Sequence, residues 1–251
     1  MKKVFLFAFI IMLMHVPAYA FHPLNTDDTG TAGKGHGKVQ LLGKFAHNEA
    51  NDVVESSSKI KASFTYGVAE NIDIEVGQPY KFKKEDYNGV VTKTDGIADA
   101  EIELKWRFYE HEHLSFALRP SLTLPSGDSD KGLGAGKVTY GLFLLATKEI
   151  DQWAFHFNAG YERTANKADD RPNIRHLSAA AEHELGKGFV LAAEIGTHSN
   201  EEKASNLYPV YTTAAVLYSP VKNIKFDLGV RLGLNRAEPD YTILPGITVK
   251  F

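Results

Sequence analysis

Three groups of residues have types and spacings that could support chemistry. The segment GLGAGK, from Gly132 to Lys137, is similar to a loop whose glycine amides cradle phosphate. However, Lys131 stands where that motif has its first glycine, Val138 replaces its Ser or Thr, and no helical pattern follows. We therefore expect a flexible surface loop and no nucleotide site.

The other two groups have the chemistry of metal ligands. Asp128 and Asp130 could hold Ca²⁺ in the same loop, but two carboxylates fall short of the about six to eight oxygens that Ca²⁺ takes. His111 and His113 could share a metal at alternate positions, yet the sequence offers no third ligand beside them. We expect no metal site and no cofactor, and we interpret these side chains as solvated loop and turn residues.

The first residues indicate the compartment. Lys2 and Lys3 precede an apolar run from Val4 to Val16, which ends in Ala18-Tyr19-Ala20. This is the pattern of a secretory signal peptide, and the run is shorter than the roughly 20 residues of a membrane-spanning helix. We expect residues 1–20 to be a signal peptide that is cleaved after Ala20.

Composition excludes some classes of function. A net charge of -3, from 28 basic and 31 acidic residues, gives no basic surface for nucleic acid. Cysteine is absent, so neither a disulfide framework nor a cysteine metal site is available. The mean hydropathy of -0.24 fits a soluble protein, but it also fits a membrane barrel whose strands alternate lipid-facing and interior residues.

The strongest signal is an alternation with a period of two. Between Ala98 and Phe108, apolar side chains take every even position and charged side chains take every odd one. Successive side chains of a strand point to opposite faces, so this pattern predicts a strand with one apolar and one charged face.

The same alternation predicts twelve strands along the mature chain. Their approximate ranges are 38–45, 59–66, 72–76, 98–108, 114–123, 138–144, 153–162, 176–185, 189–195, 208–218, 224–232 and 241–251. Apolar content is low in 176–185, and both parities fit 208–218.

The connections support one architecture. Every second connection is short, at 69–71, 109–113, 149–152, 186–188 and 219–223, and the others are longer. Short periplasmic turns and long outer loops are typical of bacterial outer-membrane barrels. We therefore predict an all-β fold, a transmembrane up-and-down antiparallel β-barrel of about 12 strands, in the outer membrane of a Gram-negative bacterium.

Aromatic residues give a second indication of a membrane barrel, because they prefer the two membrane interfaces. Those expected near the short turns are Tyr66, Trp106, Phe108, Trp153, Phe189, Tyr218 and Phe251, and those near the long loops are Tyr80, Tyr140, Tyr161, Tyr208 and Tyr241. The alternative, a soluble β-sandwich or lipocalin-like barrel in the periplasm, would not need two aromatic belts.

Three stretches of the chain resemble the outer-membrane family named for the meta-pathway of phenol degradation, whose members are described as transporters. They are NTDDTGTAGKG at 25–35, RPSLTLPSGDSDKGLGAGKVTYGLFLLATK at 119–148 and DLGVRLGLNRAEPDYTILPGITVKF at 227–251. With the strand spacing between them, the resemblance covers nearly all of the mature chain. It implies a β-barrel and transport, and it supplies no catalytic residues.

We divide the mature chain into a periplasmic N-terminal segment, residues 21–37, and a barrel, residues 38–251. The segment is a candidate to fold into the periplasmic mouth. Acidic and basic side chains are equally frequent at inward positions, which favours ion pairs across the interior over selectivity for one sign of charge. The charged residues expected to line a channel are Asp73, Glu75, Glu101, Glu103, Lys105, Arg107, Arg119, Glu182, Glu194, Asp227 and Arg231.

Two functions remain open for such a barrel. One is a narrow channel or transporter for small, aromatic or hydrophobic solutes, and the other is a structural barrel with a filled lumen. Expected partners are outer-membrane lipid and lipopolysaccharide, a small-molecule solute, and the barrel-assembly machinery, which would recognise the last strand ending in Phe251. We expect no nucleic-acid partner.

A lipid-acting outer-membrane enzyme is the least favoured hypothesis. Such an enzyme would place a Ser and a His together at the lipid face. His183 is expected to face lipid near a rim, but the spacing puts no serine beside it. We therefore predict no enzymatic activity.

Overall fold

The backbone forms one antiparallel sheet that closes on itself. The structure is a computed structural model and describes residues 22–50, 53–168 and 170–251. Its strands are β1 (Gly37–Ala50), β2 (Val53–Ala69), β3 (Ile72–Tyr87), β4 (Val90–Ile97), β5 (Ala100–His111), β6 (Leu114–Leu124), β7 (Thr139–Ile150), β8 (Trp153–Arg163), β9 (Asn173–Gly186), β10 (Phe189–His198), β11 (Val210–Val221), β12 (Ile224–Gly233) and β13 (Tyr241–Lys250). A single 3-10 helix, η1 (Ser129–Lys131), lies between β6 and β7 within these ranges.

The thirteen strands occupy twelve positions around the barrel. Each strand from β5 to β13 pairs with the next, β13 pairs with β1, and β1, β2 and β3 follow in order. The long β3 pairs with β5 over residues 72–77 and with β4 over residues 80–87. β4 and β5 therefore share one position, and the prediction of a closed twelve-stranded barrel is confirmed.

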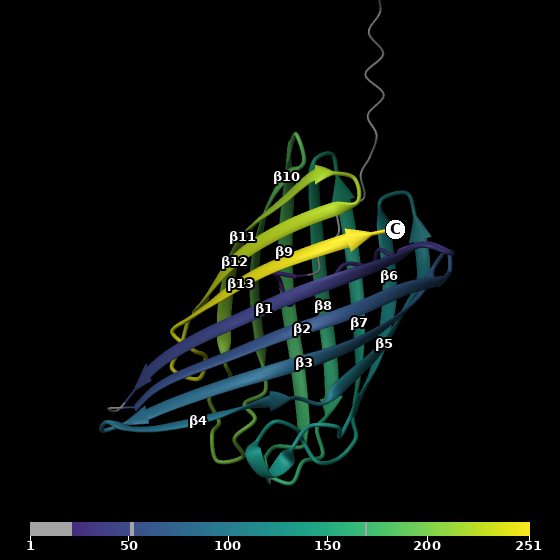
Figure 1. Cartoon of the computed structure of the whole chain (residues 1–251). Coiled ribbons are helices and arrows are strands. Elements are labelled where there is room, and N and C mark those ends of the chain that lie inside the picture. The colour runs from purple at the N-terminus through teal and green to yellow at the C-terminus, as the bar shows by residue number, and fades with distance from the viewer. Residues whose placement is uncertain (1–21, 51–52, 169) are drawn as a thin grey trace, which may run out of the picture.

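The two ends of the barrel differ, as the connection lengths predict. Two-residue turns join β2 to β3, β5 to β6, β7 to β8, β9 to β10 and β11 to β12. The longer loops and the β3–β4 hairpin lie at the opposite end (Figure 1). The C-terminus lies at the short-turn end, where Gly37 and Phe251 exchange backbone hydrogen bonds of 2.8 and 2.9 Å. Both ends of the ring of strands therefore meet at the periplasmic rim.

The outer surface of the barrel is apolar. On β12, Phe226, Leu228 and Val230 point outward and are 46%, 54% and 44% exposed, while Asp227 and Arg231 between and beyond them are buried. Such a surface is stable only against hydrocarbon, because no other layer of protein covers it. Among the described residues, no helix is long and apolar enough to cross a membrane.

Aromatic contacts mark the short-turn rim of this surface. Trp153 stacks on Phe155 with ring centroids 6.1 Å apart, and Phe189 stacks on Tyr218 at 4.3 Å. Both pairs lie next to two-residue turns, where the belt was expected. The belt therefore combines interfacial position with direct packing between neighbouring strands.

The predicted strand from Ala98 to Phe108 is wrong at its start. The backbone leaves the sheet at Ala98 and Asp99, and β5 begins only at Ala100. Ala98 is buried rather than lipid-facing, and the Asp99 carboxylate accepts hydrogen bonds from Gly127 N (2.8 Å) and Ala135 N (2.7 Å). Because the Asp99 side chain binds the backbone of the β6–β7 loop, it does not continue the inner face of β5.

Two connections that were expected to be long are strands instead. β1 extends to Ala50 and β2 starts at Val53, and a further hairpin joins β3 to β4 through Asn88 and Gly89. Asn88 and Gly89 have φ of 49° and 82°, the left-handed geometry of a tight hairpin turn. These hairpin ends carry polar residues on both faces, so they have no apolar alternation from which a strand could be predicted.

A charge placed on the outer surface should destabilise the protein according to its depth. We expect Leu228→Arg, in the middle of β12, to lower the free energy of unfolding by about 2–4 kcal/mol, because arginine there must be solvated within hydrocarbon. The measurement is equilibrium unfolding by denaturant in lipid vesicles.

The matched control is Ile150→Arg at the short-turn end of β7. Ile150 is equally exposed, at 50%, but it lies where water and headgroups are within reach. Its cost should be about 0–1 kcal/mol. Equal costs for the two variants would contradict a membrane-spanning outer surface.

Candidate functional site

Residues 22–36 run through the interior of the barrel. Thr26 is hydrogen-bonded to β9 and β10, Thr29 to β6 and β7, and Ala32 to β3. The side chains from Thr26 to Thr29 belong to residues that are at most 2% exposed. Because the contacts come from strands on different sides of the wall, the segment occupies the lumen. We call residues 22–36 the lumen segment.

Asp27 is the most strongly held residue of the lumen segment. Its carboxylate lies 2.8 Å from Lys105 Nζ on β5 and 3.0 Å from Arg119 Nη1 on β6. Burial opposes ionisation of this carboxyl, but Lys105 and Arg119 together hold the pKa of Asp27 below its ordinary value. The buried ion pair therefore ties the segment to two neighbouring strands of the wall.

A second attachment joins the segment to β10. Glu194 Oε1 accepts hydrogen bonds from Thr26 N (2.5 Å) and Thr26 Oγ1 (2.7 Å). The other oxygen of Glu194 accepts from Thr213 Oγ1 at 3.0 Å and lies 3.8 Å from Arg231 Nη2. The guanidinium of Arg231 also packs over the Tyr211 ring at 4.3 Å. Glu194 thus connects the lumen segment to a buried cation.

Further contacts hold the two ends of the segment. His22 Nδ1 lies 2.5 Å from Asp227 Oδ1 on β12. Ala32 N donates to both oxygens of Asp73 on β3, at 3.1 and 2.9 Å. The lumen segment is therefore fixed along its whole described length rather than at one point.

Asp28 differs from its neighbour Asp27. Burial, followed by repulsion from the Asp27 carboxylate, raises the pKa of Asp28 to about 6, although Lys105, 3.7 Å away, opposes the shift. Asp28 Oδ1 also accepts a hydrogen bond from Gly30 N at 2.5 Å. The lumen segment thus carries Asp27, whose ionised form is stabilised, and Asp28, whose carboxyl titrates closer to neutral pH.

The predicted lining residues occupy several groups of contacts. Lys105 and Arg119 pair with Asp27, as described above. Glu75, Glu101 and Glu103 surround Lys61, whose Nζ lies 3.1, 2.7 and 4.0 Å from their oxygens. Lys59 Nζ adds a 2.8 Å contact to Glu101. These strands carry their own charge network beside the lumen segment.

The remaining predicted residues have separate partners. Asp73, Glu194 and Asp227 bind the lumen segment, and Arg231 lies beside Glu194. Glu182 is buried, with an oxygen 3.9 Å from His156 Nε2. Arg107 lies toward the short-turn rim, 3.3 Å from Glu110. A role of any of these residues in lining a conducting channel stays a prediction.

Sequence reasoning missed the residues of the lumen segment as site residues. His22, Thr26, Asp27, Asp28 and Thr29 make its principal contacts. Two adjacent carboxylates in a segment without apolar alternation were the available signal. The side chains that these five residues contact could not be predicted, because they belong to strands about 80 to 200 residues away along the chain.

The motifs with candidate chemistry have structural roles. Asp128 caps η1, with Oδ1 accepting from Asp130 N and Lys131 N. The GLGAGK loop is not free on the surface as expected, because Leu133 is buried and Asp99 holds Ala135. His111 ends β5 and His113 lies in the following turn. Within the described residues, no cluster of three or more His, Asp or Glu side chains could hold a metal.

His183, the residue considered for a lipid-acting enzyme, packs against an aromatic ring. Its ring stacks on Trp153 with centroids 4.3 Å apart, and its backbone pairs with Trp153 and Leu191. This contact places His183 in the aromatic belt at the short-turn rim.

Two cavities lie beside the lumen segment. The larger, of about 370 Å³, opens at the short-turn rim and is bordered by Asp28, His36, Lys38, Lys105, Lys222, Lys225, Lys250 and Phe251 among others. The smaller, of about 20 Å³, shares Lys38, Asp73 and Lys105 with it and reaches Arg119 and Glu103. Both are polar spaces between the lumen segment and the inner face of the wall, and residues of β1, β3 and β5 border both of them.

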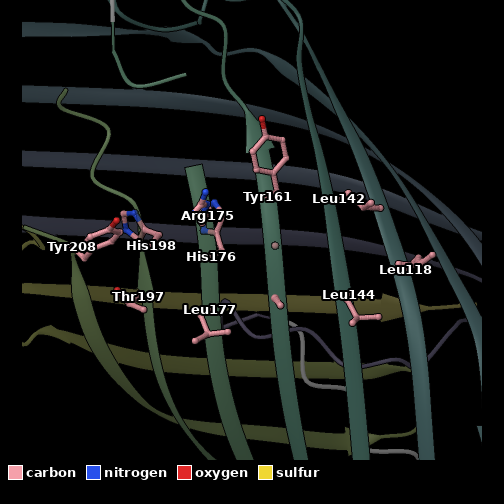
Figure 2. Close-up of a pocket in the computed structure, with 12 residues that line it drawn as sticks. Leu118, Leu142, Leu144, Tyr161, Arg175, His176, Leu177, Thr197, His198 and Tyr208 are labelled. Atoms are coloured by element: carbon pink, nitrogen blue, oxygen red, sulfur yellow. The ribbon is translucent and has the colours of Figure 1, made fainter. Parts of the chain in front are cut away.

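A third hollow, of about 610 Å³, lies on the outer face. Figure 2 shows Leu118, Leu142 and Leu144 on one side of it and Leu177, Thr197 and Tyr208 on the other, with Tyr161 between them. Its apolar walls fit lipid chains, consistent with contact between the barrel and the outer-membrane lipid or lipopolysaccharide.

A closed twelve-stranded barrel with an apolar outer surface and a charged interior defines a bacterial outer-membrane protein of the porin-like type. Residues 25–251 match the family model described as "Putative MetA-pathway of phenol degradation". The chain therefore belongs to this family, as its sequence motifs indicate. No curated protein matches the chain.

Solved structures with similar folds are outer-membrane barrels. The COG4313 outer membrane channel from Pseudomonas putida F1 is 12% identical, with a TM-score of 0.69, and the match covers 91% of this chain and 100% of that chain. The KdgM porin is 12% identical, with a TM-score of 0.56 and coverage of 85% and 99%. The β domain of the Bordetella autotransporter Brka is 11% identical, with a TM-score of 0.55 and coverage of 86% and 99%. At these identities the similarity shows the fold alone.

Removing the charge of Asp27 should destabilise the barrel. We expect Asp27→Asn to lower the free energy of unfolding by about 3–5 kcal/mol, because Lys105 and Arg119 would remain buried without their shared carboxylate. Denaturant unfolding in detergent micelles measures this change.

Asp128→Asn is the matched control for that substitution. It removes an equal charge from an exposed ion pair with Lys131 (3.5 Å) and keeps an acceptor for the cap of η1. Its cost should be about 0–1 kcal/mol. If both variants unfold alike, the buried ion pair does not hold the lumen segment.

Asp28 should make stability depend on pH. A carboxyl whose folded-state pKa is raised stabilises the fold below its ordinary pKa and loses that contribution as pH rises through about 6. We expect Asp28→Asn to be more stable than the wild type at pH 8 by on the order of 2 kcal/mol, and nearly equal to it at pH 4. Unfolding curves at both pH values check this; a difference that does not change with pH contradicts it.

Proposed function

We propose that the protein is an outer-membrane channel for small solutes, and that the lumen segment occludes it until the segment is displaced. The observation that carries the proposal is the position of residues 22–36 in the lumen, where hydrogen bonds and ion pairs make most of their contacts with the wall. Leu24 adds a small apolar cluster with Ala180, Ala192, Ala215 and Leu217. Polar and ionic contacts can exchange for contacts with water when a segment moves, whereas a packed apolar core cannot.

The shape of the interior supports small solutes. The cavities beside the segment have volumes of about 370 and 20 Å³, which favours small solutes over large ones. Their borders are largely charged or polar, which favours hydrophilic solutes, or solutes with a polar group, in this part of the lumen. The family name suggests aromatic or hydrophobic solutes. Such solutes fit this interior when they also carry a charged or polar group.

The fold agrees with transport but does not decide it. The family and the porin and channel structures support a channel. The similar autotransporter domain is a reminder that one barrel architecture serves several functions. A barrel that stays permanently filled is the competing outcome.

A disulfide lock tests the proposal directly, because the chain contains no native cysteine. Thr29 Oγ1 and Ser115 Oγ lie 2.5 Å apart, one on the lumen segment and one on β6. We expect the Thr29→Cys/Ser115→Cys protein to be silent in planar bilayers when oxidised and to conduct when reduced, because only the reduced segment can leave the lumen.

The two single-cysteine variants are the controls, and both should conduct with and without oxidant. Equal conductance of the oxidised and reduced double variant would show that conduction does not require displacement of the lumen segment. A correctly folded wild type that never conducts and admits no small solute into liposomes would favour the filled structural barrel.

A further inference from the structure

The larger cavity has an excess of positive side chains that the proposed channel function does not by itself explain. Its borders include five lysines, Lys38, Lys105, Lys222, Lys225 and Lys250, of which Lys105 is paired with Asp27 at 2.8 Å. The negative groups on its borders are the side chains of Asp28 and Asp73 and the C-terminal carboxylate of Phe251. This distribution differs from the equal number of acidic and basic residues that the sequence pattern predicts for the interior as a whole. We call this cavity the lysine vestibule.

Neighbouring strands bring three of the lysines together. In the register of the sheet, Lys38 on β1 lies directly opposite Lys250 on β13, and Lys225 on β12 pairs with Thr248 two residues before Lys250. Like charges directly opposite each other in a sheet repel and cost free energy. An anion seated between them would convert that repulsion into attraction.

The carboxylates nearby are already engaged by other groups. Both oxygens of Asp73 accept from Ala32 N, and Asp28 accepts from Gly30 N and lies near Lys105. Asp227, next but one to Lys225, contacts His22 at 2.5 Å. These contacts hold the acids to the lumen segment, and Asp227 and Asp28 also attract Lys225, so the cluster on β1, β12 and β13 has counter-charges beside it.

The remaining borders suit an organic anion of modest size. Gln40, Asn223 and Thr248 supply uncharged polar groups, and Phe251 supplies an aromatic side chain at the opening. A volume of about 370 Å³ lies at the lower end of the range of sites for small molecules, which is roughly 300–1,000 Å³. The position of Lys222 and Asn223 in the β11–β12 turn opens the vestibule toward the periplasm.

We infer that the lysine vestibule is a binding site for a small organic oxyanion, whose carboxylate or phosphate group lies among Lys38, Lys225 and Lys250. This inference deepens the proposed channel function by naming a solute class. An anion bound there would lie beside the lumen segment, next to Asp28 and Ala32, at the periplasmic end of the lumen.

Binding can be measured without any current, on the full chain purified in detergent. Benzoate is the organic probe, benzamide is its uncharged counterpart of nearly equal shape, and inorganic phosphate tests for a simple oxyanion. We expect benzoate to raise the unfolding midpoint in a saturable way at constant ionic strength, because a ligand that binds only the folded state stabilises it. Benzamide should produce no shift.

The variant that tests the site is Lys225→Gln/Lys250→Gln, and the matched control is Lys187→Gln in the neighbouring β9–β10 turn. The stabilisation by benzoate should be lost in the first and kept in the second. A shift with phosphate as large as that with benzoate would assign the site to oxyanions in general, and a shift with benzoate alone would assign it to carboxylates with an organic body. No shift with either anion, or a shift that the double variant retains, overturns the inference.

Bilayer recordings separate this inference from the channel proposal. If the wild type conducts, it should prefer Cl⁻ over K⁺ in a KCl gradient, and the Lys225→Gln/Lys250→Gln variant should lose that preference. Conduction without benzoate binding would reject the vestibule and leave the channel. Benzoate binding without conduction would reject the channel and leave the binding site.

Discussion

The carboxylate of Asp27 between Lys105 and Arg119 is the interaction on which the interior arrangement depends. Burying two cations from adjacent strands is costly unless carboxylates neutralise them, and Asp27 reaches both. Here that anion comes from outside the sheet, on a segment that has no secondary structure of its own. Glu103 of the wall lies 3.6 Å from Arg119, but Asp27 is the carboxylate that contacts both cations, and the attachments of Thr26 and Ala32 add to the position that Asp27 defines.

The sequence predicted the wall well, because a single physical requirement acts on each strand at every second residue. Lipid excludes charge from one face, so the period of two survives even in 176–185, which lies within β9. The requirement ends where the strands leave the membrane, and there the prediction failed: β1, β2 and β3 extend into water with polar residues on both faces. The Asn88-Gly89 pair is typical of a two-residue hairpin turn, but a prediction based on apolar alternation alone does not take turn residues into account.

The interior was predicted only in part. The alternation along each strand predicted that charged residues such as Glu194 and Asp227 face inward. It does not predict which of these residues contact each other across the lumen. The contacts of Glu194 with Thr26 and of Asp227 with His22 join distant parts of the chain through a segment without periodicity. Asp99 shows the same limit, since its role depends on where the β6–β7 loop returns. The prediction of equal acidic and basic residues over the whole interior likewise gave no sign of the lysines that gather in the vestibule.

The seam between β1 and β13 has a consequence for the order in which the molecule is assembled. Gly37, the first residue of β1, is hydrogen-bonded to Phe251, and the lumen segment immediately precedes Gly37. Once β1 and β13 are paired, the lumen is accessible through the two ends of the barrel. Pairing of β1 with β13 must therefore be coordinated with entry of residues 22–36. If the strands paired first, these residues would have to enter the lumen from the periplasmic end.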